Sequence, residues 1–129
     1  FQPFRDFEGA SRSQFAANMA RAKRKFALMH ELGCDTLLLC SNVQPDCSAD
    51  VALQVADLAA LAALAEQEKI VIGYEALAWG THVNRWYQAW TRVKSVSRIF
   101  FSFSAFTCTV YTNFLSSLWR ASRDCRIIS

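Results

Sequence analysis

The sequence has few of the residues that mark nucleotide-binding loops, structural metal sites and tight turns. Its 129 residues include four Gly, two Pro and two His. No GxGxxG or P-loop pattern occurs, so a nucleotide-binding doubly wound sheet lacks its usual marker. The five Cys form no CxxC pair and show no Cys/His spacing of the zinc type, which excludes a zinc-finger arrangement.

Acidic residues are nearly absent from the second part of the chain. Residues 1–75 contain seven Lys or Arg and ten Asp or Glu, whereas residues 76–129 contain seven Lys or Arg and one acid, Asp124. The last Gly is Gly80 and the last Pro is Pro45. The net charge of +3, with no basic stripe between aromatic residues, does not indicate a nucleic-acid partner. The chain therefore has two parts of different composition, and the first part is the more informative about fold and function.

The cysteine usage and the first residues bear on the compartment. An odd number of Cys without a signal-peptide layout is typical of reduced thiols, so we expect a cytoplasmic protein. The chain starts without Met, and we interpret it as the middle of a longer protein. A composition that is 53% hydrophobic supplies enough apolar residues for a packed core.

Apolar residues recur at spacings of four and three, which predicts amphipathic helices. The first helix is expected to begin at the Ser11–Gln14 capping box and to end at Gly33. A second follows the loop at Pro45, and a third starts after Gly80. Their apolar faces are predicted to be Phe15, Met19, Ala22, Phe26 and Met29; Val51, Val55, Leu58, Ala62 and Ala65; and Val83, Tyr87, Trp90 and Val93.

Two short apolar runs alternate with these helices. Thr36–Cys40 and Ile70–Tyr74 have the length and composition of parallel strands buried on both faces. They begin 34 residues apart, and strand, loop and helix repeated at this period form the βα unit of a parallel α/β protein. The first run is followed by Ser41-Asn42, which could equally form a turn or a functional loop.

The second run leads directly to a carboxylate, Glu75, and then to a loop that contains His82 and Asn84. Barrel enzymes place catalytic and metal-binding groups where a strand ends in this way. On local pattern alone, a Glu that caps the next helix or pairs with a cation is the better interpretation. Trp79 either lines a pocket or packs in the core.

Four blocks in this order closely resemble bacterial 3-dehydroshikimate dehydratases, which belong to the xylose isomerase-like TIM barrels. The blocks are FQPFRDFE at 1–8, RKFALM at 24–29, LCSNV at 39–43, and GYEALAWG followed by His-Val-Asn at 73–84. Some members are fused to a dioxygenase-like domain. The resemblance covers about residues 1–96, and it implies that the first βα unit lies upstream of Phe1. It predicts an α/β fold, a partial (β/α)8 TIM barrel of about three βα units with an irregular C-terminal tail.

The resemblance also implies a chemistry, a lyase reaction of quinate and shikimate degradation. The family converts 3-dehydroshikimate to protocatechuate with a divalent metal such as Mg, Mn or Co. The family's metal carboxylate at the end of the fourth strand corresponds to Glu75. Arg5 would grip the substrate carboxylate, with a salt bridge to Asp6 or Glu8 as the structural alternative. Asn42 and His82 are the weaker substrate-binding candidates.

Other parts of the family's site do not occur in this sequence. The Asp-Ser-Phe-His motif, which supplies a metal ligand and the catalytic His, is absent after Val96. We therefore assign no catalytic residue and expect an inactive segment that does not bind the metal, since a single carboxylate cannot hold a divalent ion. The enzyme alternative is a segment of a sugar isomerase or epimerase barrel.

The last stretch is interpreted separately, with residues 1–96 as the partial barrel and residues 97–129 as a divergent tail, frameshifted near Val96 or disordered. Residues 99–119 form an uncharged run of 21, long enough to cross a bilayer. Eight of them are Ser, Thr or Asn, which makes insertion marginal. A membrane-associated, non-enzymatic chain is therefore the less favoured alternative.

Overall fold

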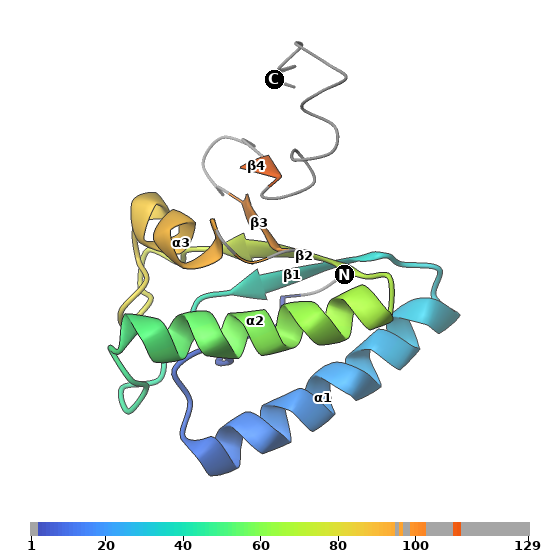
Figure 1. Ribbon diagram of the computed structural model, residues 1–129, viewed down its shortest axis with the longest axis horizontal. Coiled ribbons are helices and arrows are strands. Elements are labelled where there is room, and N and C mark those ends of the chain that lie inside the picture. The colour runs from blue at the N-terminus through green and yellow to red at the C-terminus, as the bar shows by residue number, and fades with distance from the viewer. Residues whose placement is uncertain (1–2, 95, 97–98, 103–109, 112–129) are drawn as a thin grey trace.

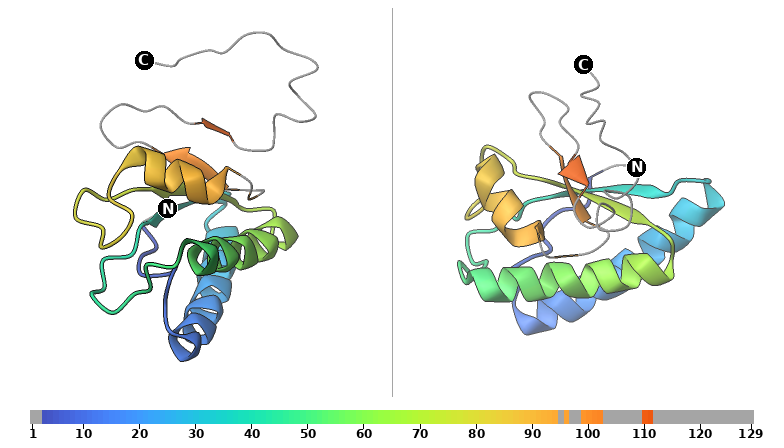
Figure 2. Two further views of the ribbon diagram at one scale, coloured as in Figure 1. Left: turned by 60° about the vertical axis from the view of Figure 1, so that its left-hand side comes forward. Right: turned by 45° about the horizontal axis from the view of Figure 1, so that its top comes forward.

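The computed structural model describes residues 3–94, 96, 99–102 and 110–111, which form a sheet with helices packed on one side (Figure 1). Two long helices, α1 and α2, lie next to each other along this side of the sheet in the views of Figures 1 and 2. In chain order the elements are α1 (Arg12–Glu31), β1 (Thr36–Cys40), α2 (Val51–Gln67), β2 (Val71–Glu75), α3 (Trp86–Val93), β3 (Ile99–Ser102) and β4 (Val110–Tyr111).

The sheet is parallel where the sequence predicts it to be. Strand β1 pairs with β2 and β2 pairs with β3, all parallel, and β4 is antiparallel to β3. On the other side of β1, Phe4 forms a parallel bridge with Leu39, with its N–H donating to the Leu38 carbonyl at 2.7 Å. Helix α2 connects the parallel pair β1 and β2, as a βαβ unit requires. The predicted α/β class is confirmed.

The core lies between the sheet and the helices. Leu37 and Leu39 of β1 stand beside Ile72 and Tyr74 of β2, and all four side chains are buried. They pack with the predicted stripes of α1 and α2, in which Ala22, Phe26, Met29, Leu58, Ala62 and Ala65 are buried. Each fully buried Leu, Ile or Phe contributes roughly 1.5–3 kcal/mol. Since side chains alternate along a strand, Cys40 and Glu75 lie on the opposite face of the sheet.

The ends of α1 confirm the predicted signals, with one difference. The Ser11 hydroxyl accepts the Gln14 N–H at 3.3 Å, and Gly33 follows the helix with a φ of 65°. The Gln14 side chain does not return to the backbone of Ser11 as a full capping box would. Its amide donates to the Asn18 side chain at 3.1 Å instead.

The prediction for the third helix is wrong in its start and partly in its apolar face. Helix α3 begins at Trp86, because the Gln88 side chain accepts the N–H groups of Asn84 and Arg85, both at 2.9 Å, and caps the helix there. Val83 is buried but precedes the helix, and Tyr87 is 52% exposed. The buried face of α3 consists of Ala89, Arg92 and Val93.

Part of the expected tail continues the sheet. Residues 99–102 form β3, with Ile99 opposite Ile72 of β2. Apart from these residues and 110–111, the segment 97–129 lies outside the described residues, so its interpretation as a divergent tail stays a prediction. The same holds for most of the run 99–119. Within the part of the chain that the structure describes, no helix is both long and apolar enough to span a membrane.

A buried carboxylate joins the N-terminal segment to α2. Asp57 is 1% exposed and accepts the Gly9 N–H at 2.9 Å. The Arg12 guanidinium donates to both oxygens of the same carboxylate, at 2.9 and 3.1 Å. This arrangement fixes the loop before α1 against α2.

We expect the Asp57→Ala substitution to destabilise the fold by about 2 kcal/mol or more, because it removes a bidentate ion pair and leaves the Gly9 N–H without its acceptor. Urea unfolding followed by circular dichroism measures the change. Lys23→Ala, at an exposed position of α1, is the matched control and should change the free energy of unfolding by less than about 0.5 kcal/mol. Equal effects of the two substitutions would contradict the prediction.

Candidate functional site

The candidate site is the edge of the sheet where the parallel strands end. Cys40 and Glu75, the last residues of β1 and β2, are register partners. The Cys40 N–H donates to the Phe4 carbonyl at 2.8 Å, and the Ser41 N–H donates to the Glu75 carbonyl at 2.9 Å. The residues that follow Phe4, β1 and β2 therefore leave the sheet at one edge, which is where parallel α/β proteins place their functional groups.

Glu75 lies on the face of the sheet opposite the helices, next to a thiol. It is partly exposed, and its Oε2 accepts the Cys40 Sγ–H at 3.5 Å. Burial raises the pKa of the Cys40 thiol to about 12, helped by the charge and the hydrogen bond of Glu75 and opposed by the charge of Arg5. Within the described residues Glu75 forms no ion pair, so the alternative of a Glu paired with a surface cation is not supported.

Arg5 lies at the same edge and has an exposed side chain. Its guanidinium is near enough to Cys40 for its charge to favour the thiolate. Among the described residues no ion pair joins it to Asp6 or Glu8, which was the structural alternative. Its backbone carbonyl accepts a hydrogen bond from Arg21 of α1. The side chain of Arg5 is thus available to a ligand.

Asn42 is buried, and both polar atoms of its side chain have partners within the protein. Its Nδ2 donates to the Glu8 carbonyl at 2.8 Å, and its Oδ1 accepts the Gln44 N–H at 2.9 Å. The side chain holds the loop after β1 against the loop after Phe4. It lies at the expected edge of the sheet, in a supporting position.

His82 holds two loops together. Its Nε2 lies 2.9 Å from the Cys47 carbonyl, so the loop after β2 is fastened to the loop after β1. Thr81 adds two bonds between the same loops, to the carbonyls of Asn42 and Gln44. A side chain at Gly80 would meet the Val83 carbonyl at 2.2 Å, so only Gly fits at this close approach. Trp79 is 69% exposed and does not pack in the described core.

Our reasoning from the sequence missed the role of Glu8. This side chain is 1% exposed, and its Oε1 accepts the Asn42 N–H and the Tyr74 hydroxyl, both at 2.7 Å. Burial raises its pKa to about 7. A signal was present, since a Tyr within the apolar run 70–74 needs a buried partner for its hydroxyl.

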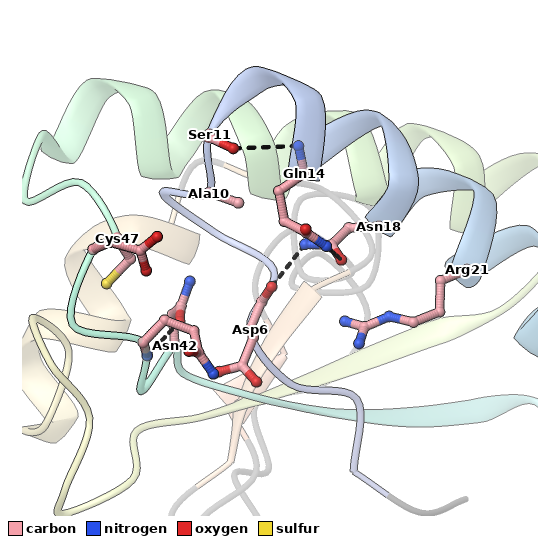
Figure 3. A pocket seen from close by; sticks show the side chains of 10 residues that line it. Asp6, Ala10, Ser11, Gln14, Asn18, Arg21, Asn42 and Cys47 are labelled. Atoms are coloured by element: carbon pink, nitrogen blue, oxygen red, sulfur yellow. Dashed lines mark hydrogen bonds between the residues drawn. The ribbon is translucent and has the colours of Figure 1, made fainter.

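A pocket of about 340 Å³ lies beside these loops, between them and α1 (Figure 3). Gln14, Asn18 and Arg21 of α1 line one side, where the Asn18 side chain donates to the Asp6 carbonyl at 2.7 Å, and Asn42 and Cys47 line the other side. The Arg21 guanidinium lies over the Phe4 ring, 4.3 Å from its centre. The pocket is polar, and it lies on the side of the sheet that carries α1.

The divalent metal implied by the resemblance was compared with the groups present. Such ions take about six oxygen ligands. In the described part of the chain, no three His, Cys, Asp or Glu side chains come together in a way that could hold a metal. The strand ends contribute one carboxylate, Glu75, and the Cys40 thiol. These residues do not fit a divalent metal by themselves.

We expect Cys40 to react slowly with iodoacetamide at pH 8, because a thiol with a pKa near 12 has a thiolate fraction roughly 100-fold or more below that of a free thiol. The Glu75→Gln substitution should lower this pKa and accelerate the reaction, since it removes a neighbouring negative charge. Peptide-resolved mass spectrometry measures both rates, with Cys34 as internal reference. Glu31→Gln, at an exposed position, should change neither. An unchanged Cys40 rate in Glu75→Gln would show that the two side chains do not meet.

Known relatives match the chain over most of its length. It is 54% identical over 94 residues to the 3-dehydroshikimate dehydratases of Pseudomonas putida and Pseudomonas aeruginosa, covering 73% of this chain and 15% of each relative. The 3-dehydroshikimate dehydratase of Neurospora crassa is 30% identical over 102 residues, 75% of this chain and 28% of that protein. The resemblance drawn from the four sequence blocks is confirmed. The chain nevertheless spans only about 15% of the length of its Pseudomonas relatives.

A solved structure agrees with this result. A xylose isomerase-like TIM barrel/4-hydroxyphenylpyruvate dioxygenase fusion protein matches with a TM-score of 0.76 and 50% identity, over 78% of this chain and 16% of that one. The family model described as xylose isomerase-like TIM barrel matches residues 1–118, beyond the Val96 at which the sequence predicts a departure. Together with the parallel strands and their common carboxyl edge, these matches confirm the predicted partial barrel. The chain belongs to the xylose isomerase-like TIM barrel family.

Proposed function

We propose that this chain is a segment of a 3-dehydroshikimate dehydratase, an enzyme that eliminates water from 3-dehydroshikimate to form protocatechuate. The observation that carries the proposal is the 54% identity to two dehydratases together with the position of Glu75 at the carboxyl end of β2. Parallel α/β barrels bind their substrates at this edge. The substrate is accordingly a small molecule.

Two side chains at this edge have the chemistry that the reaction requires of a binding surface. Arg5 offers an exposed guanidinium, which can pair with the carboxylate of 3-dehydroshikimate through two parallel hydrogen bonds. Glu75 offers a carboxylate on the face of the sheet opposite the helices, and by resemblance it is one ligand of the divalent metal. Asn42 and His82 support this surface through the loops they fasten.

The described residues do not complete a site for the metal, Mg, Mn or Co, so no step of the elimination is assigned to it here. The proton next to the substrate ketone must be removed by a base that we do not identify among these residues. We therefore propose that the 129-residue chain by itself is inactive, and that the activity belongs to the longer protein.

In a longer protein that contains this segment and the rest of the barrel, we expect Glu75→Gln to lower kcat/KM for 3-dehydroshikimate by about 100-fold or more. Removal of mere supporting groups at metal sites already costs 10–100-fold, so loss of a ligand should cost at least as much. Protocatechuate absorbance measures the rate. Glu31→Gln is the matched control and should leave the rate unchanged.

The proposal fails if the longer protein converts a sugar by isomerisation or epimerisation and leaves 3-dehydroshikimate unchanged. Parallel assays with ketose and aldose substrates distinguish these activities. Protocatechuate formation by the isolated 129-residue chain would contradict its proposed inactivity.

Arg5→Gln should raise KM by roughly tenfold, with a smaller effect on kcat, because a guanidinium that grips the substrate carboxylate binds the ground state and the transition state alike. Steady-state kinetics of the longer protein separates the two constants. Lys23→Gln, also a loss of one exposed positive charge, is the control. An unchanged KM in Arg5→Gln would show that the substrate carboxylate binds elsewhere.

A further inference from the structure

The most unusual group in the described chain is the carboxyl of Glu8. It is 1% exposed, and its hydrogen bonds are concentrated on one oxygen, Oε1, which accepts from Asn42 and Tyr74. Its other oxygen, Oε2, is buried and has no hydrogen-bond partner. A buried carboxylate oxygen without a donor is costly when it is charged, whereas a proton on it removes the charge.

Hydrogen bonds from Asn42 and Tyr74 partly stabilise a charged Glu8, but the titratable groups around it do not compensate the negative charge. Asp6, on the same segment, raises its pKa through like-charge repulsion. Cys40 of β1 and Cys47 of the following loop both feel the negative charge of Glu8. Tyr74 of β2 donates its hydroxyl, and burial and the Glu8 charge raise the pKa of this phenol, so it stays neutral.

A cation on a neighbouring element, Arg92, has other partners. Arg92 of α3 acts electrostatically on Tyr74, but its Nε donates to the Gln54 side chain at 2.7 Å and its Nη1 to the Gln88 carbonyl at 3.0 Å. Within the described residues no ion pair includes Glu8. Burial without an ion pair therefore favours the neutral form of the carboxyl in the folded chain.

Glu8 connects two loops and the end of β2 at the carboxyl edge. It belongs to the loop after Phe4, it accepts the N–H of Asn42 in the loop after β1, and Tyr74 is the residue before Glu75 at the end of β2. The Asn42 side chain returns a bond to the Glu8 carbonyl at 2.8 Å. Opening of the first two loops would let water reach Oε2.

We propose that Glu8 is a proton-dependent latch: with a proton on Oε2 it holds the loops after Phe4 and β1 together and against the end of β2, and loss of this proton loosens them. The proposal concerns these loops and does not depend on the dehydratase activity.

The direction of the effect follows from proton linkage. The carboxyl has a pKa of about 7 in the closed loops and an ordinary value of 4.5 when it is hydrated. The closed state thus binds more protons, so its stability is greatest below pH 4.5 and is lost as the pH rises through 7. Between pH 6 and pH 8 this difference predicts about a tenfold loss of the closing equilibrium.

Hydrogen exchange at the Asn42 N–H, followed by NMR on the 129-residue chain, tests the latch. After correction for the intrinsic exchange rate, we expect its protection factor to fall about tenfold from pH 6 to pH 8. Glu8→Gln, which is neutral at every pH and keeps an acceptor oxygen, should abolish this loss. Glu31→Gln, at an exposed position, should retain it in full.

Tyr74→Phe keeps the buried ring and removes the hydroxyl that stabilises the charged form of Glu8. The protection factors should be lower at every pH in this variant, and the midpoint of their loss should lie at a higher pH. The latch is overturned if the wild-type factor does not change with pH, if Glu8→Gln keeps the slope, if the midpoint does not move in Tyr74→Phe, or if the Asn42 N–H is unprotected at pH 6.

Discussion

The parallel pairing of β1 with β2 determines where the functional groups of this chain lie. Because both strands run in the same direction, their carboxyl ends meet at one edge, and the register sets Cys40 beside Glu75. The bridge between Phe4 and Leu39 extends the same arrangement to the segment that carries Arg5. Helix α2 makes the parallel pairing possible by returning the chain to the start of the sheet. An antiparallel pairing would have separated these groups.

The loops at this edge are held by polar groups that the fold removes from water. Glu8, Ser41 and Asn42 are buried, and each satisfies backbone groups of a loop other than its own. Buried polar groups contribute little net stability, but they tolerate few alternative arrangements because an unmade bond is expensive. The edge is therefore held in one arrangement, at the expense of a carboxyl oxygen without a partner. Such compromises are common where a protein positions functional groups.

Several apolar side chains at the outside of the described structure have no cover. Leu28 of α1 and Leu32, which caps its C-terminal end, are 50% and 57% exposed, and Trp79 and Trp86 are 69% and 55% exposed. In a complete barrel, neighbouring βα units cover the helices and close both edges of the sheet. This chain spans only a small part of the length of its Pseudomonas relatives, which agrees with that explanation. These exposed side chains therefore support the proposal that the active protein is longer.

Much of the fold was predictable because it depends on local periodicity. The stripe of α1, most of the stripe of α2 and the strand Thr36–Cys40 follow from spacing along the chain. Two details differ, since Val51 is 47% exposed and the second strand begins at Val71, one residue later than predicted. The start of α3 was not predictable, because Gln88 caps the helix through a side-chain contact that spacing does not encode. Patterns along the chain were sufficient to predict the α/β class, the order of elements and the position of Glu75 at a strand end. The contact between Glu8 and Tyr74, 66 residues apart, and the support of the loops by Asn42 and His82 became visible only in the folded chain, because burial and hydrogen bonding depend on which segments the fold brings together.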